Sequence, residues 1–350
     1  MTELSSGKLR GLKKLADKSG RFKMLAIDQR APMARALDTI LAPRKASYDD
    51  VAPIKSLLAE TLAPESSAVL VDPDFGLTPC EPFITRDNGL LITLETPQFE
   101  ETKGGRKSAP LKDLDVAKIK RLGADGVKLM LWYRADADND VRAHQQSFAR
   151  QVGEECRRHD IPFLLELLVY PFLGEANHST DYKEDERKRP ELVLEGLRHF
   201  ADPEEFGVDI HKVESPVAAK DLPDPDGSEA IDSQSWFDKV STIIDRPWVL
   251  LSAGADMAQF ERILTYAYRA GANGYLAGRA IWWPAFQALP DLARMKAILV
   301  TDALEYQNRI NCLTDKEARS WTSAGCFHNG LSLSHGGEHF PSAYGSNLGA

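Results

Sequence analysis

Eight short apolar segments recur along the chain, and stretches with helical periodicity lie between them. The apolar segments are rich in Val, Ile and Leu and have the length of buried strands. They cover residues 23–28, 67–72, 89–95, 124–131, 162–169, 207–214, 247–252 and 272–278. Helices are predicted at 47–63, 113–122, 141–159, 256–270 and about 285–310. This alternation predicts an α/β fold, a (β/α)8 TIM barrel.

A doubly wound open sheet is the alternative fold. It usually has fewer strands and a glycine-rich dinucleotide-binding turn after the first strand. Here the first predicted strand ends in Asp28-Gln29-Arg30, and no GxGxxG follows it. The barrel is therefore the favoured fold.

The two ends of the chain flank this predicted barrel. Residues 2–18 carry leucines on one helical stripe, so we expect an N-terminal helix that covers one end of the barrel. We place the single barrel domain at 1–315 and an irregular C-terminal extension at 316–350. From Trp321 onward the chain is rich in Gly, Ser, His and Asn, which is typical of a loop or of an arm that crosses to another subunit. A homo-oligomer is expected.

Two internal segments are predicted to be loops. Residues 99–110 are glycine-rich and basic, and residues 183–189 form a run of charges that is typical of a solvated loop.

Composition excludes several classes of partner. The chain of 350 residues has a formal net charge of −9, which argues against nucleic acid and anionic membranes as partners. It has no apolar run long enough to span a bilayer and no secretory signal, so a cytoplasmic location is predicted. The four cysteines lack CxxC spacing, and the two glycines within His335-Gly-Gly-Glu-His339 disfavour a zinc-binding helix. Neither a metal nor a cofactor is predicted.

Lys212 is the centre of the predicted active site. Strand alternation places it on one face with Val208 and Ile210. A buried amine tends to lose its proton, and a neutral amine is a nucleophile toward carbonyl groups. An isolated lysine of this kind more often reaches solvent from the end of a strand.

Three other predicted strands also carry a charged residue near their carboxyl ends. These residues are Asp28, Lys128 and Glu166. Each alone would be read as a structural ion pair. Together with Lys212 they are two acids and two bases at strand ends that converge on one mouth of the barrel. Such a group can form an imine and move the protons that imine chemistry requires.

Small residues after the last two predicted strands suggest a phosphate site. Ser252, Ala253 and Gly254 follow the seventh strand, and Gly278 and Arg279 follow the eighth. Backbone N–H groups and an arginine can hold a phosphate there, as is common in these barrels. An ordinary helix cap and a surface arginine are the alternative interpretation.

Several motifs together resemble a known family. Val-Lys-Leu at 127–129, Leu-Glu-Leu at 165–167, His-Lys-Val-Glu at 211–214 and Ser-Ala-Gly at 252–254 are similar to the class I tagatose-1,6-bisphosphate aldolases, over roughly residues 5–315. The resemblance implies that Lys212 forms a Schiff base with the substrate and that Glu166 transfers protons. It implies that Lys128 helps to lower the pKa of the Lys212 amine and holds substrate hydroxyls, and that Asp28 and Gln29 contact the substrate chain. It also implies that Ser252, Ala253, Gly254, Gly278 and Arg279 hold the phosphate of the dihydroxyacetone phosphate half.

The function that follows is metal-independent cleavage of a ketose 1,6-bisphosphate to dihydroxyacetone phosphate and glyceraldehyde 3-phosphate. A related possibility is a sulfofructose-phosphate aldolase, which gives a sulfonated aldehyde. Arg30, Lys103 and Arg106 are candidates for binding the distal anion, and the sequence does not say which anion it is. A metal-dependent lyase or isomerase, or a sugar-phosphate sensor on the same barrel, are alternatives of other classes.

Overall fold

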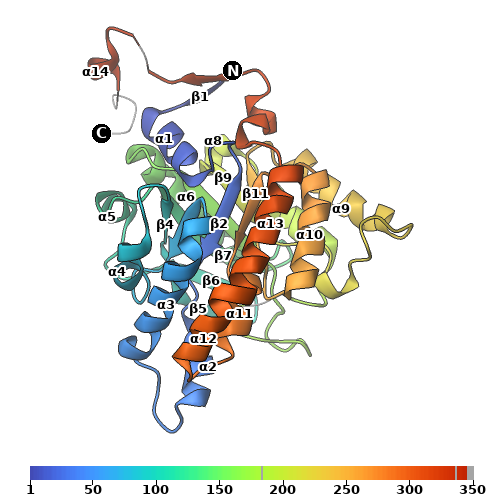
Figure 1. Cartoon of the computed structure of the whole chain (residues 1–350). Helices are drawn as coiled ribbons and strands as arrows, with labels where there is room; N and C mark the ends of the chain where they lie inside the picture. The colour runs from blue at the N-terminus through green and yellow to red at the C-terminus, as the bar shows by residue number, and fades with distance from the viewer. Residues whose placement is uncertain (183, 336, 345–350) are drawn as a thin grey trace.

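The computed structural model describes residues 1–350 except 183, 336 and 345–350 (Figure 1). Eight parallel strands close into a barrel in the order β10-β11-β2-β3-β4-β7-β8-β9. This confirms the predicted barrel. The strands are β2 (Phe22–Ala26), β3 (Ala68–Val71), β4 (Gly89–Thr93), β7 (Gly126–Trp132), β8 (Phe163–Leu168), β9 (Ile210–Val213), β10 (Trp248–Leu250) and β11 (Gly274–Ala277).

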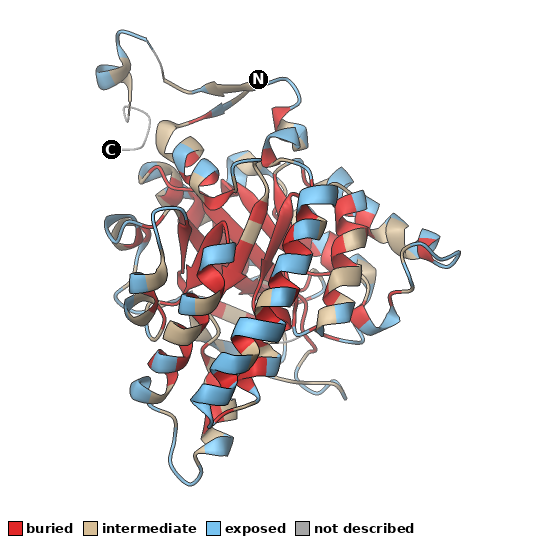
Figure 2. Ribbon diagram, in the orientation of Figure 1, coloured by how far each residue is buried: buried red, intermediate tan, exposed pale blue. Residues whose placement is uncertain are grey.

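Helices surround the strands, and Figure 2 shows buried strands inside helices whose outward faces are exposed. The helices of eight or more residues are α1 (Ser6–Leu15), α2 (Ala31–Ile40), α3 (Tyr48–Leu62), α6 (Asn139–Arg158), α7 (Pro190–His199), α9 (Ala230–Ile243), α10 (Met257–Arg269), α11 (Arg279–Phe286) and α13 (Leu304–Glu317). Shorter ones are α4 (Leu77–Cys80), α5 (Val116–Arg121), α8 (Pro203–Phe206), α12 (Leu292–Ile298) and α14 (Phe340–Ala343).

Aliphatic side chains fill the barrel interior at the end covered by α1. Met24, Leu70, Leu91, Leu164 and Ile210 belong to one buried cluster there. Leu12 and Leu15 of α1 join this cluster, so the N-terminal helix covers one end of the barrel, as predicted.

The register of β8 and β9 determines which side chains lie next to each other at the open mouth of the barrel. Leu164 of β8 pairs with Ile210 of β9, and two residues further along Glu166 pairs with Lys212. Because side chains two residues apart on a strand share a face, Glu166 and Lys212 lie directly above the apolar layer.

The two chain ends differ from the prediction. Residues Thr2–Leu4, predicted as part of the N-terminal helix, form β1, which pairs in parallel with β12 (Leu331–Leu333). The C-terminal extension thus contains a strand and the short helix α14, at the end of the molecule where α1 lies (Figure 1). The strand-forming partner lies more than 300 residues away in sequence, which a local pattern does not reveal.

The segment predicted as a basic loop at 99–110 is a hairpin. β5 (Glu95–Thr102) pairs with β6 (Gly105–Pro110) in antiparallel fashion, and Gly105, with a φ of 136°, helps form the turn. Its inner side is held by polar contacts: the Ser108 backbone N–H donates to Gln145 Oε1 of α6 at 3.0 Å. The prediction was wrong because these strands carry polar side chains.

Two further predictions need correction. The helix expected at about 285–310 is divided into α11, α12, a π-helical turn (Leu299–Ala303) and α13, and Pro290 lies in the first break. Within 183–189, Lys188 is buried and pairs with Glu184 and Glu214, at 2.8 Å in each case, so the segment is not uniformly solvated. Residue 183 lies outside the described residues.

Candidate active site

Lys212 and Glu166 form a buried pair at the mouth of the barrel. The Lys212 ammonium lies 3.0 Å from Glu166 Oε2, and the two residues are 4% and 0% exposed. β9 and β8 position them side by side. The structure therefore brings together the two residues at which the predicted chemistry is centred.

Lys128 of β7 lies against the same carboxylate. Its ammonium is 3.1 Å from Glu166 Oε2, 3.0 Å from Asp28 Oδ2 and 2.8 Å from Glu95 Oε1. Burial opposes a charge on Lys128, but Glu166, Glu95 and Asp28 outweigh it and raise the Lys128 pKa. Burial likewise raises the pKa of Asp28, but Lys128, Lys212 and Arg30 outweigh it and lower that pKa to about 2. Lys128 is thus a fixed cation among carboxylates.

A cavity of about 260 Å³ opens beside this cluster. Asp28, Gln29 and Arg30, which follow β2, line it together with Lys128. The Arg30 guanidinium is buried, donating to the Glu95 carbonyl oxygen at 2.7 Å and pairing with Asp74 at 3.3 Å. Gln29 Oε1 is buried and accepts no hydrogen bond from the described residues. Polar side chains thus line the wall of this cavity.

The two segments predicted to bind phosphate meet at the same mouth. Ala253 and Gly254, with φ angles of 45° and 94°, form a left-handed turn after β10. Gly278 precedes α11, and Arg279 begins it. A Cβ atom placed on Gly254 would lie 3.6 Å from Arg279 Nη1, so the turn and the guanidinium are neighbours. A positive φ at an alanine is uncommon, and such outliers are often found at functional sites.

Arg279 is the one unpaired cation in this pair of segments. Among the described residues its guanidinium has no ion pair, and it lies 5.4 Å from the centroid of the Tyr182 ring. Burial lowers the Arg279 pKa to about 10, partly offset by Glu166, Asp28 and Asp181. At neutral pH the side chain is still cationic and can receive an anion. The N-terminus of α10, by contrast, already has a carboxylate partner. Asp256 caps it and accepts from the Gln259 backbone N–H at 2.8 Å.

His211 faces away from the Lys212 side of β9, as predicted. Burial, with a smaller effect of Arg246, lowers its pKa to about 3. Within the described part of the chain, no group of three or more His, Cys, Asp or Glu side chains is arranged to hold a metal ion. In the same residues no helix combines the length and apolar character needed to cross a membrane.

Comparison with known proteins gives the family. Residues 22–283 match the model of the DeoC/LacD family aldolases, and this segment contains all eight barrel strands and every residue of the cluster. The chain belongs to the DeoC/LacD family of aldolases. It is therefore a lyase.

Curated relatives of this aldolase cover most of its length. It is 32% identical over 330 residues to tagatose 1,6-diphosphate aldolase 2 of Streptococcus mutans serotype c, covering 91% of this chain and 98% of that protein. It is 31% identical over 334 residues to the tagatose 1,6-diphosphate aldolase of Lactococcus lactis subsp. lactis, again covering 91% and 98%.

Solved structures of other aldolases have the same fold. The fructose-bisphosphate aldolase of Plasmodium falciparum superimposes with a TM-score of 0.61 at 14% identity, over 91% of this chain and 98% of that one. An archaeal fructose-1,6-bisphosphate aldolase, solved with its catalytic lysine bound to a carbinolamine intermediate, gives a TM-score of 0.52 at 17% identity, over 87% and 98%. At these identities the likeness concerns the fold.

Glu95 of this aldolase was not among the predicted site residues. Besides pairing with Lys128, Glu95 accepts from the Met130 backbone N–H at 3.0 Å and from the Thr93 hydroxyl at 2.5 Å. A signal was present, because Glu95 is the last residue of the third apolar segment, as Asp28 is of the first.

Tyr182, whose hydroxyl donates to Glu166 Oε1, was not predicted either. Tyr182 lies in the long connection between β8 and α7. This connection has no periodicity from which the direction of the side chain could be inferred.

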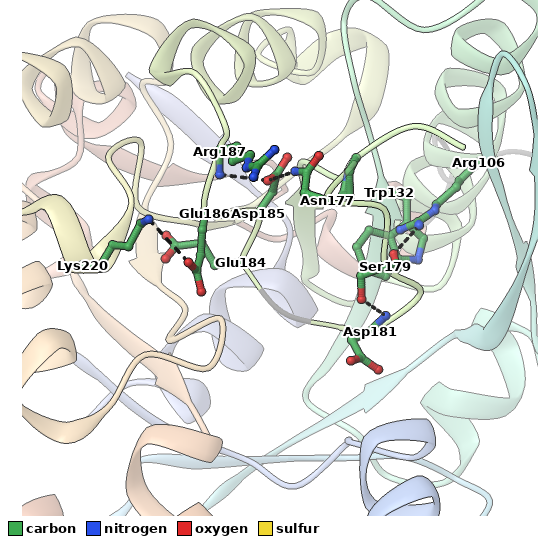
Figure 3. A pocket seen from close by; sticks show the side chains of 11 residues that line it. Arg106, Trp132, Asn177, Ser179, Asp181, Glu184, Asp185, Glu186, Arg187 and Lys220 are labelled. Atoms are coloured by element: carbon green, nitrogen blue, oxygen red, sulfur yellow. Dashed lines mark hydrogen bonds and ion pairs between the residues drawn. The ribbon is translucent and has the colours of Figure 1, made fainter. Parts of the chain in front are cut away.

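Two of the three candidates for the distal anion lie elsewhere. Lys103 is exposed on the turn of the β5–β6 hairpin. Arg106 is buried, pairs with Glu101 at 3.0 Å and is surrounded by aromatic rings. It lines a second cavity of about 360 Å³ with Asn177, Glu184 and Lys220 (Figure 3). Of the three candidates, only Arg30 lines the cavity beside Lys128.

Proposed function

We propose that this aldolase cleaves a ketose 1,6-bisphosphate, such as tagatose 1,6-bisphosphate, through a Schiff base on Lys212. The observation that supports this most is the unequal pairing of the two buried lysines. Lys128 contacts three carboxylates, which keep it charged, whereas Lys212 contacts only Glu166 among the described residues. An amine must lose its proton before it can attack a carbonyl group. Fewer carboxylates oppose that loss at Lys212 than at Lys128, and Glu166 lies within 3.0 Å to accept the proton.

Glu166 is the proton-transfer group of this scheme. The Lys212 amine attacks C2 of the ketose, and the carbinolamine loses water to give a cationic imine. Glu166, 3.0 Å from the amine, takes the proton from the C4 hydroxyl as the C3–C4 bond breaks, and the bonding electrons move into the imine. The aldehyde leaves. The resulting enamine is reprotonated at C3, and water releases dihydroxyacetone phosphate and the free lysine.

The remaining residues hold the substrate in this proposal. Lys128 keeps a positive charge beside the reacting carbons, and Asp28 and Gln29 contact the substrate hydroxyls. Ser252, Ala253, Gly254, Gly278 and Arg279 hold the phosphate next to the carbonyl. Arg30 is the candidate for the distal anion, because it lines the same cavity as Lys128.

Arg279→Ala should weaken binding of phosphorylated ketoses. It removes a charge-assisted contact worth roughly 1.5–3 kcal/mol, so KM should rise roughly 10- to 150-fold. Steady-state kinetics with the bisphosphate measures this. Arg309→Ala is the control, because Arg309 pairs with Glu261 on the outer helices. An unchanged KM for Arg279→Ala would remove Arg279 from the phosphate site.

The substrate itself is tested by parallel cleavage assays. Tagatose 1,6-bisphosphate and sulfofructose 1-phosphate should be offered at equal concentrations, with EDTA present throughout. We expect cleavage of the bisphosphate at full rate in EDTA. Faster cleavage of the sulfonate would assign the distal site to that anion, and loss of activity in EDTA would indicate a metal-dependent lyase instead.

The predicted homo-oligomer and cytoplasmic location stay predictions. Light scattering of the purified protein tests the first, and fractionation of the producing cells tests the second.

A further inference from the structure

Tyr182 holds one oxygen of Glu166 while the two lysines take the other. The Tyr182 hydroxyl donates to Oε1, and Lys212 and Lys128 lie 3.0 and 3.1 Å from Oε2. A carboxylate that can rotate would present either oxygen to its neighbours. With Oε1 occupied by a phenol, Oε2 is the oxygen that faces the lysine amine.

The segment that carries Tyr182 forms a wall between the two cavities. Thr180 and Tyr182 line the cavity beside Lys128, whereas Ser179 and Asp181 line the second cavity, where Figure 3 shows them. The wall is anchored on its outer side, because Arg106 donates to the Ser179 carbonyl oxygen at 2.5 Å and Arg35 pairs with Asp181 at 2.6 Å.

Tyr182 is also tied to the segments proposed to bind phosphate. Its ring lies edge-on to Trp132, with centroids 5.9 Å apart, and 5.4 Å from the Arg279 guanidinium. Two residues further on, the Glu184 backbone N–H donates to the Ala253 carbonyl oxygen at 2.9 Å. Arg279 and the Ala253 turn thus flank the tyrosine that holds Glu166.

We propose that Tyr182 is a positioning residue for the reaction: its hydroxyl fixes the Glu166 carboxylate for proton transfer at Lys212, and its ring contacts the cation that holds the substrate phosphate. This inference rests on the proposed function of Lys212 and Glu166. The hydroxyl acts through Glu166, and no bond to it forms or breaks during the reaction. A tyrosine that only filled space at the cavity wall would make no difference to proton transfer.

The two parts of the side chain can be separated by substitution. Tyr182→Phe keeps the ring beside Trp132 and Arg279 but removes the hydroxyl. We expect kcat to fall roughly 10- to 100-fold, as for loss of a hydrogen bond to a charged group, while KM for the bisphosphate stays within about threefold. Tyr182→Ala should lower kcat and also raise KM.

Tyr170→Phe is the matched control. The Tyr170 ring is also edge-on to Trp132, at 6.0 Å, but its hydroxyl accepts from the Arg106 backbone N–H and does not contact Glu166. This variant should keep the wild-type kcat. Circular dichroism of each variant verifies that the fold is retained.

A half-reaction identifies the step that Tyr182 affects. The rate at which dihydroxyacetone phosphate alone exchanges its C3 proton in D₂O, followed by NMR, depends on Glu166 but not on the aldehyde. Tyr182→Phe should slow this exchange as much as it slows cleavage. A normal kcat, or normal exchange with slow cleavage, would overturn the assignment. Absence of cleavage and exchange in the wild-type enzyme would instead contradict the proposed function.

Discussion

Replacing Lys212 by arginine should leave no measurable cleavage of the bisphosphate. The positive charge beside Glu166 is retained, but a guanidinium stays protonated and cannot add to a carbonyl group. Steady-state assays of the purified variant measure the loss, and its circular dichroism spectrum should match that of the wild type.

Lys23→Arg is a suitable control for this substitution. Lys23 lies in β2 and pairs with Asp17 and Asp315, outside the Lys128 cluster. It should retain full activity. Normal turnover by Lys212→Arg would show that another group forms the intermediate or that none is formed.

Glu166→Gln should lower kcat by about 10²- to 10⁴-fold, the range expected for loss of a general acid–base group. Glutamine keeps the shape of the side chain and an oxygen that can accept from the lysines, so KM should change little. Loss of water from the carbinolamine also needs an acid. Trapping of the Schiff base should therefore slow along with turnover, which rapid quenching with borohydride measures.

Glu214→Gln is the matched control, because Glu214 is also a buried glutamate paired with a lysine near the end of a barrel strand. It pairs with Lys188 and accepts from the Val169 backbone N–H, without contacting Lys212. It should lower stability and keep kcat. Near-normal turnover by Glu166→Gln would make Glu166 a structural counter-ion, and Asp28 would become the better candidate for the acid.

The barrel could be predicted because its signal is local and repeated. Each buried parallel strand is an apolar run, and turn-forming or polar residues follow each run and end it. The meeting of Lys128, Glu166 and Lys212 followed from one topological rule, since the carboxyl ends of all barrel strands lie at one mouth. The same rule, applied to the third run, would have included Glu95, which completes the set of carboxylates around Lys128.

The features that were missed depend on contacts between distant parts of the chain. Pairing of β1 with β12 joins the two ends of the molecule. The β5–β6 hairpin is polar on both strands, so hydrophobic alternation does not mark it. Tyr182 reaches Glu166 from an irregular connection that contacts distant parts of the chain, for example through the hydrogen bond from Arg106 to the Ser179 carbonyl oxygen. A run of charged residues in such a connection predicts a solvated loop, yet Lys188 in this run is buried.

The role of Lys212 is tested most directly by trapping the covalent intermediate. The enzyme should be mixed with dihydroxyacetone phosphate, reduced with borohydride, digested and mapped by mass spectrometry. We predict irreversible inactivation and a single modified peptide, with the three-carbon adduct on Lys212. Modification of Lys128 with Lys212 untouched, or full activity after reduction, would contradict the account.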